Sequence, residues 1–99
     1  MATKVTAKFD TDDDAELLFE GESYCFYNHD LIIERTFGTP IECYALLRSI
    51  TMKEHKGGML EMFNEFVEDA ISKHYLQGDG WSSMSGNQQY EINFYDVEA

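Results

Sequence analysis

The sequence predicts an α+β fold, in which two helices pack on one face of a small antiparallel or mixed sheet. Residues 4–9 and 90–95 alternate apolar with polar side chains, as half-buried strands do. The stretches 40–56 and 59–76 instead carry apolar residues at helical spacing. With 99 residues, 43% of them hydrophobic, the chain is expected to fold as one domain over residues 1–99.

The first third of the chain is expected to form a β-meander. Aromatic and small apolar residues favour strands, and the Asp- and Asn-rich segments between them favour turns. The stretch 15–20 fits either a strand or one helical turn that ends at Gly21. The expected order is a strand at 4–9, a turn at 10–14, the ambiguous segment at 15–20, a strand at 24–27, a turn at 28–30 and a strand at 31–37.

Two helices and a last strand should follow. Thr39 as N-cap, Pro40 at the first position and Glu42 closing a capping box predict a helix start. This helix should continue past Lys56 and end at the glycines 57–58. Its apolar face is Cys43, Leu46, Leu47 and Ile50, and the apolar face of the second helix is Met59, Met62, Phe63, Phe66, Val67, Ala70 and Ile71. Residues 79–88 read as a Gly/Ser-rich loop that carries Trp81, before the closing strand.

The charge balance limits the kinds of partner that the protein can bind directly. Nineteen acidic residues against seven Lys and Arg give a formal net charge of −12. Nucleic acid and anionic membranes are therefore poor direct partners, since both are bound through Lys and Arg. No run approaches the ~18 apolar residues of a membrane span. Two cysteines without a secretory signal suggest reduced thiols, so we expect a cytoplasmic protein of a bacterial or phage-infected cell.

Metal sites match the sequence poorly. Asp10, Asp12 and Asp14 fit positions 1, 3 and 5 of an EF-hand loop, but Ala15 stands where the loop needs glycine and Gly21 where it needs glutamate. Zinc ligands usually come in closely spaced pairs. The Cys and His residues here lack that spacing: Cys25, His29, Cys43 and His55. Cys43 fits better as a small buried core residue. We expect no metal and no cofactor.

No catalytic motif is present either. Cys25, His29 and Asp30 supply the residue types of a thiol nucleophile with a base, but catalytic triads are usually assembled from distant segments. The Gly57-Gly58 pair is not followed by the Lys-Ser/Thr of a phosphate-binding loop. We therefore expect a non-enzymatic protein.

The acidic surplus is the strongest functional signal. A net charge of −12 exceeds the ~2–8 usual for a small domain, and self-repulsion at that level costs stability. A basic protein partner would compensate it, and a halophilic source is the other explanation. Carboxylates one helical turn apart are spaced about 6 Å, close to two phosphate steps of DNA. The expected partner-binding residues are Asp10, Asp12, Asp13, Asp14, Glu16, Glu20, Glu22, Glu61, Glu65, Glu68, Asp69 and Trp81.

In size, acidity and single-domain build, the chain looks like small phage-encoded antidefence proteins, such as anti-CRISPR and anti-restriction inhibitors. That likeness implies an inhibitor that blocks the nucleic-acid site of a basic protein, in some cases by mimicking DNA. An immunity protein or antitoxin that neutralises a basic nuclease toxin would use the same electrostatics, and an acidic adaptor subunit would involve no mimicry. The final strand, residues 90–97, could also pair across a homodimer.

Overall fold

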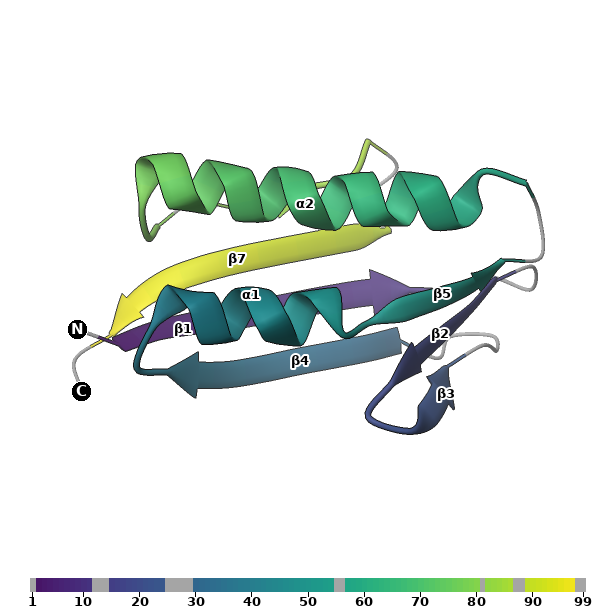
Figure 1. Ribbon diagram of the computed structural model, residues 1–99, viewed down its shortest axis with the longest axis horizontal. Helices are drawn as coiled ribbons and strands as arrows, with labels where there is room; N and C mark the ends of the chain where they lie inside the picture. Colours follow the sequence, from purple (N-terminus) through teal and green to yellow (C-terminus); the bar gives the residue numbers. More distant parts are fainter. Residues whose placement is uncertain are drawn as a thin grey trace.

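The α+β class is confirmed by the computed structural model, which describes residues 2–11, 15–24, 30–54, 57–80, 82–86 and 89–97. Two helices lie on one face of a larger sheet, and a smaller sheet closes one end of the core (Figure 1). The elements are β1 (Ala2–Asp10), β2 (Ala15–Phe19), β3 (Glu22–Tyr24), β4 (Asp30–Phe37), α1 (Pro40–Arg48), β5 (Thr51–Glu54), α2 (Met59–Gln77), β6 (Ser82–Met84) and β7 (Tyr90–Val97).

The larger sheet has the order β4-β1-β7-β6, and all its neighbours are antiparallel. Val5 in β1 lies opposite Arg35 in β4 and Phe94 in β7, so these three side chains share one face. The alternation predicted for residues 4–9 and 90–95 holds, with the apolar members turned toward the helices. Pairing of β1 with β7 brings both ends of the chain to the same side of the molecule (Figure 1).

The smaller sheet has the order β3-β2-β5 and is also antiparallel. The ambiguous segment 15–20 is therefore a strand, not a helical turn. Its hairpin turns through Glu20 and Gly21, whose φ angles are 50° and 82°. Two positive φ values in a two-residue loop define a type I′ turn, which matches the twist of the flanking strands. Of the predicted strand at 24–27, the structure describes only Tyr24, in β3.

One core joins both sheets and both helices. Its largest fully buried side chains come from β1, β2, β4, α1, α2 and β7, and β5 adds Met52. Phe9 and Phe63 meet edge to face at 5.3 Å between ring centroids, which ties β1 to α2. Cys43 is completely buried, as its position on the apolar helix face predicted, and its thiol lies 3.7 Å from the carbonyl oxygen of Thr3.

The first helix is shorter than predicted. It begins at Pro40 as expected, but Thr39 makes no side-chain hydrogen bond to cap it, so the predicted capping box is wrong. It ends at Arg48, and Thr51–Glu54 forms β5 instead of a further helical turn. The cause is burial: Met52 is buried opposite Leu17 of β2, a contact that a helix over 40–56 would not make.

The second helix follows the prediction closely and ends before Gly78. Gly78 takes a φ of 83°, and its N–H donates to the carbonyl of His74 at 2.7 Å. The prediction of an inward Met62 is wrong, because that side chain is 69% exposed while neighbouring Phe63 fills the core. No helix of the described ranges combines the length and apolarity required to span a membrane.

One expectation about the C-terminal part is also corrected. The predicted loop at 79–88 contains β6, where Ser83 is buried opposite Ile92 of β7. Residues 91–93 of β7 therefore lie between β1 and β6, and pairing of the rest of this strand across a dimer stays a prediction. Among the described strands, β4 is the long edge of this sheet.

Candidate functional site

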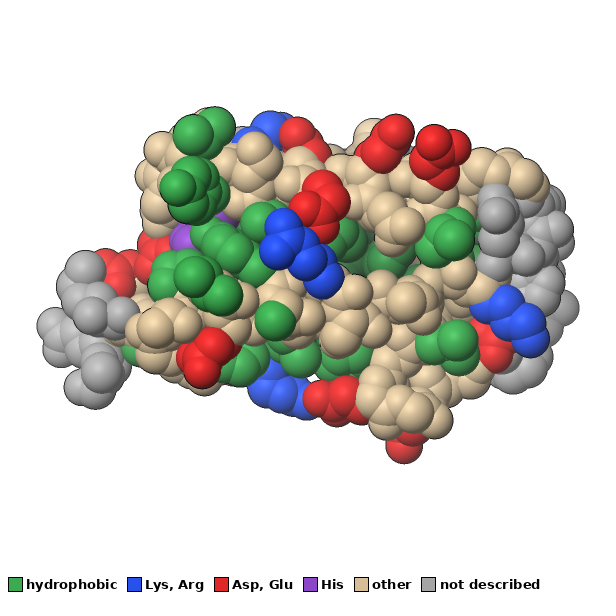
Figure 2. Space-filling view, in the orientation of Figure 1, with side chains coloured by type: hydrophobic (Ala, Val, Ile, Leu, Met, Phe, Trp, Pro, Cys, Tyr) green, Lys and Arg blue, Asp and Glu red, His purple; other side chains and the backbone are tan. Residues whose placement is uncertain are grey.

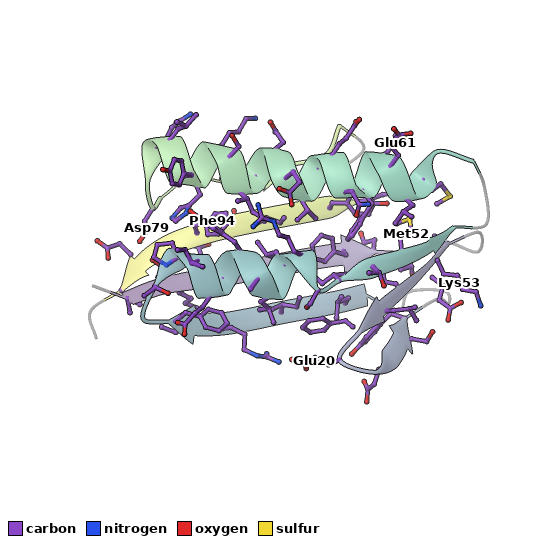
Figure 3. The ribbon with its side chains drawn as sticks, in the orientation of Figure 1. Glu20, Met52, Lys53, Glu61, Asp79 and Phe94 are labelled. Atoms are coloured by element: carbon purple, nitrogen blue, oxygen red, sulfur yellow. The ribbon has the colours of Figure 1, made fainter. Side chains whose placement is uncertain are left out.

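The first half of α2 carries two exposed carboxylates, Glu61 and Glu65, which we call the acidic face. They are four residues apart and line a surface hollow of about 530 Å³ together with Asn64 and Glu68. Figure 2 shows acidic side chains along this edge of the molecule, and Figure 3 labels Glu61 there. No described Lys or Arg forms an ion pair with either residue. Both charges are thus available to a partner.

The other two predicted partner-binding acids of α2, Glu68 and Asp69, are neutralised within the chain. Glu68 turns toward α1, where Arg48 donates to its two carboxylate oxygens from Nε and a terminal nitrogen, both at 2.8 Å. This hydrogen bond lowers the pKa of Glu68 and raises the pKa of Arg48. Asp69 pairs with Lys73 one turn further along, at 3.0 Å. The structure therefore separates Glu68 and Asp69 from Glu61 and Glu65 in charge environment, although all four share one helix.

The predicted N-terminal acids lie mostly on the smaller sheet, which is at the same end of the molecule as the start of α2 (Figure 1). Glu16 contacts both Lys53 and Ser23, and Glu20 lies 3.4 Å from Arg35. Glu22 accepts a hydrogen bond from the Tyr24 hydroxyl at 3.1 Å, which raises the pKa of that tyrosine. Asp10 ends β1, with Lys8 at 3.9 Å. Asp12, Asp13, Asp14 and Trp81 lie outside the described residues.

Positive charge is compensated throughout the part of the chain that the structure describes. Every Lys and Arg there lies within 4.0 Å of a carboxylate: Lys4 with Glu34, Lys8 with Asp10, Arg35 with Glu20, Arg48 with Glu68, Lys53 with Glu16 and Lys73 with Asp69. Among Lys, Arg, Asp and Glu of the described residues, those left without an opposite charge are therefore carboxylates, in line with the net charge of −12.

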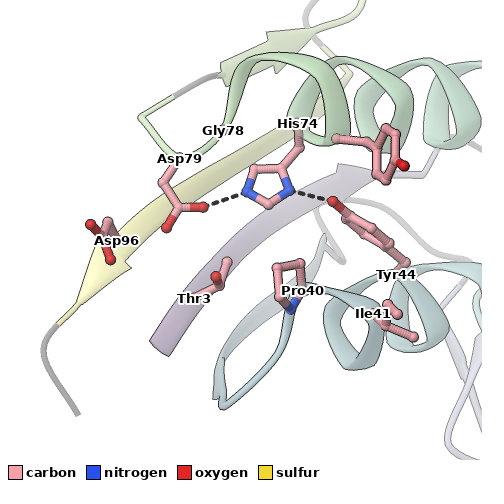
Figure 4. Close-up of a pocket in the computed structure, with 9 residues that line it drawn as sticks. Thr3, Pro40, Ile41, Tyr44, His74, Gly78, Asp79 and Asp96 are labelled. Carbon is pink, nitrogen blue, oxygen red and sulfur yellow. Dashed lines mark hydrogen bonds and ion pairs between the residues drawn. The ribbon is translucent and has the colours of Figure 1, made fainter. Parts of the chain in front are cut away.

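A buried polar network lies at the far end of α2. The hydroxyl of Tyr44 in α1 lies 2.6 Å from Nδ1 of His74 in α2, and Nε2 of His74 contacts Oδ1 of Asp79 just after the helix (Figure 4). The imidazole also stacks on Phe94 of β7, at 4.1 Å between ring centroids. His74 is 3% exposed, so these contacts are made almost entirely away from water.

The protons in this network can be assigned from chemistry. Burial raises the pKa of Tyr44, which keeps its hydroxyl protonated and able to donate to Nδ1 of His74. Nε2–H then donates to the carboxylate of Asp79. The arrangement orients the imidazole and fastens α1, α2 and β7 to one another.

A cavity of about 550 Å³ lies beside this network, and we call it the Asp79 pocket. Its lining comes from the start of α1, the end of α2 and the ends of β1 and β7 (Figure 4). The lining residues are Thr3, Pro40, Ile41, Tyr44, His74, Tyr75, Gly78, Asp79 and Asp96. Its volume falls within the roughly 300–1,000 Å³ typical of ligand sites.

Sequence reasoning missed every polar residue of this region. His74 continues the apolar spacing of Ala70 and Ile71 on α2, and that position was the one available signal that it is buried. Tyr44 lies thirty residues away from it along the chain. Nothing in the local sequence indicates that Tyr44, Asp79 and Asp96 gather at the end of the same helix.

The structure adds no residue to the metal sites or to the thiol nucleophile considered from the sequence, as far as the described residues go. Within the described ranges, no three His, Cys, Asp or Glu side chains are placed to hold a metal ion together. Cys25, His29 and His55 lie outside those ranges, and buried Cys43 points at a backbone carbonyl.

Comparison with known proteins found no similarity: no family model, curated protein or solved structure matches this chain.

Proposed function

We propose that this protein is a non-enzymatic acidic inhibitor that binds a basic nucleic-acid-handling protein and covers its nucleic-acid site. It would act in the cytoplasm of a bacterial or phage-infected cell, as antidefence proteins do. The observation that carries the proposal is the pairing of every described Lys and Arg with a carboxylate of the same chain. The charge that remains for a partner is negative.

The acidic face supports the same proposal. Glu61 and Glu65 stand one turn apart on a helix held by five buried side chains, so their spacing is rigid. Carboxylates on a rigid body can occupy positions that a basic groove offers to phosphates. Exposed charges of this kind chiefly speed association and exclude wrong partners.

Affinity capture from a bacterial lysate treated with nuclease tests the proposal. The immobilised protein should retain a basic nucleic-acid-binding protein at about 50 mM NaCl and release it at about 500 mM, because salt screens exposed charges. Glu61→Lys with Glu65→Lys should reduce the capture. Glu34→Lys with Glu91→Lys, on the sheet face turned away from the helices, makes the same change in net charge and should reduce it less.

The purified partner then separates the alternatives. An inhibitor should displace DNA or RNA from it, and an adaptor should leave nucleic-acid binding intact. A captured nuclease toxin whose activity disappears on binding would instead indicate an immunity protein. If the protein retains only neutral partners and salt does not release them, both the inhibitor and the immunity-protein hypotheses are contradicted.

A further inference from the structure

The Asp79 pocket has two chemically different ends. Pro40, Ile41 and Tyr75 form one side, and the carboxylates of Asp79 and Asp96 lie at the opposite end (Figure 4). The two carboxylates come from different elements, since Asp79 follows α2 and Asp96 lies near the end of β7. A ligand in this cavity would thus meet both apolar surface and negative charge.

Among the described Lys and Arg residues, none neutralises the negative end. No described Lys or Arg lines the pocket, and neither Asp79 nor Asp96 forms an ion pair with one. Asp79 uses Oδ1 for its contact with His74. Asp96 is exposed at the rim, opposite Thr3 of β1.

The apolar end is unusually exposed for such large side chains. Ile41 and Tyr75 are 74% and 78% accessible, and they form part of the hydrophobic patch between α1 and α2 in Figure 2. The patch continues from the pocket into a neighbouring hollow of about 310 Å³, where Ile41, Tyr44, Ile71 and Tyr75 form the lining together with Ser72 and the Arg48–Glu68 ion pair. Exposed apolar patches of this kind commonly mark binding surfaces.

We propose that the Asp79 pocket receives an arginine side chain of the basic partner protein. Arginine combines an apolar stem with a planar cation that stacks on aromatic rings and pairs with carboxylates. The stem would lie on the side formed by Pro40, Ile41 and Tyr75, and the guanidinium would meet the carboxylates of Asp79 and Asp96 at the opposite end. An apolar neighbour in the partner would cover the exposed apolar side chains of the adjoining hollow. This inference rests on the proposed function, because it supposes a basic protein partner.

Amide chemical shifts of the whole ¹⁵N-labelled protein test the pocket without the natural partner. The probe is the blocked peptide acetyl-Leu-Arg-Leu-amide, and its twin carries neutral citrulline in place of arginine. The arginine peptide should shift the amides of Tyr75, Gly78, Asp79 and Asp96 and leave those of Glu61 and Glu65 unchanged. Equal shifts with the citrulline peptide, or shifts spread over all acidic residues, would overturn the proposal.

Two charge-matched variants complete the experiment. Asp96→Asn should weaken binding of the arginine peptide about fivefold, which is the scale of one exposed ion pair. Glu61→Gln makes the same charge change on the acidic face and should leave the peptide affinity unchanged. If the captured partner binds Asp96→Asn as well as the parent protein, the pocket assignment fails while the proposed function stands. If no variant retains a basic protein, the proposed function fails independently of the peptide result.

Discussion

His74 is the residue on which the end of the helical layer depends. It joins Tyr44 of α1 to Asp79 after α2 and stacks on Phe94 of β7, so one buried side chain touches three elements. A polar group in such a place stabilises the fold only while its partners are present, because an unpaired buried donor or acceptor loses its hydration without compensation.

Replacing His74 with phenylalanine should therefore destabilise the protein despite conserving an aromatic ring. His74→Phe keeps the stack on Phe94 but leaves the Tyr44 hydroxyl and one oxygen of Asp79 without their partner. We expect the free energy of unfolding to fall by about 1–3 kcal/mol in urea titrations. Tyr44→Phe removes one hydrogen bond only and should cost less. A His74→Phe variant as stable as the parent would show that the network adds nothing.

Cys43 offers a second test at the same scale. Burial raises the pKa of its thiol to about 11. Because the folded pKa lies above the unfolded one, this group should lower stability as the pH rises from about 9 toward 11 and have no effect below that window. With Cys25→Ser leaving a single thiol, the native protein should react with a disulfide reagent at about pH 8 at least about a hundredfold more slowly than the unfolded chain. Equal rates would place Cys43 outside the core.

At the scale of elements, α1 and β5 show how far a local sequence pattern can predict structure. The start at Pro40 and the buried Cys43, Leu47 and Ile50 follow from residues within a few positions of each other. The end at Arg48 does not, since β5 exists through its pairing with β2, more than thirty residues earlier. Strand pairing is non-local, so the sequence pattern alone favoured continuing the helix.

Two methionines test this element directly. Met52 would leave the apolar face of a helix over 40–56, but in β5 it is 4% exposed, so Met52→Ala should lower the free energy of unfolding by about 2–5 kcal/mol. Met62→Ala is the matched control, because that side chain is exposed on α2 and its loss should change stability by less than about 0.5 kcal/mol. Thermal or urea denaturation measures both. Similar costs for the two variants would contradict the placement of β5.

At the scale of the whole molecule, the fold class and the order of the main elements were predictable, and most of the site was not. Periodicity identified β1, α2 and β7, because each repeats its pattern over at least six residues, and apolar composition identified β4. The excess of Asp and Glu over Lys and Arg predicted a surface with net negative charge. Which carboxylates are neutralised depends on tertiary neighbours. Glu65 and Glu68 are three residues apart on α2, yet only Glu68 pairs with Arg48.

The same reasoning explains why the pocket was not foreseen. Its lining comes from four separate stretches of chain, and its charged members, Asp79 and Asp96, lie outside every acidic run in the sequence. Residue type and spacing do not predict that these residues meet in one pocket until the strand order is known. Our proposals take the kind of partner from the acidic surplus, and the place where one of its side chains would be held from the fold.

The salt dependence of association with the captured partner tests the central claim most directly, since steering by surface charge acts on the rate of encounter. Between about 50 mM and about 500 mM NaCl, the association rate constant should fall by about tenfold or more, with a much smaller change in dissociation. Glu61→Lys with Glu65→Lys should lower the association rate at low salt and flatten this dependence. An association rate that stays constant across the salt range, or that both charge reversals leave unchanged, would contradict the claim that the surplus carboxylates serve to meet a basic partner.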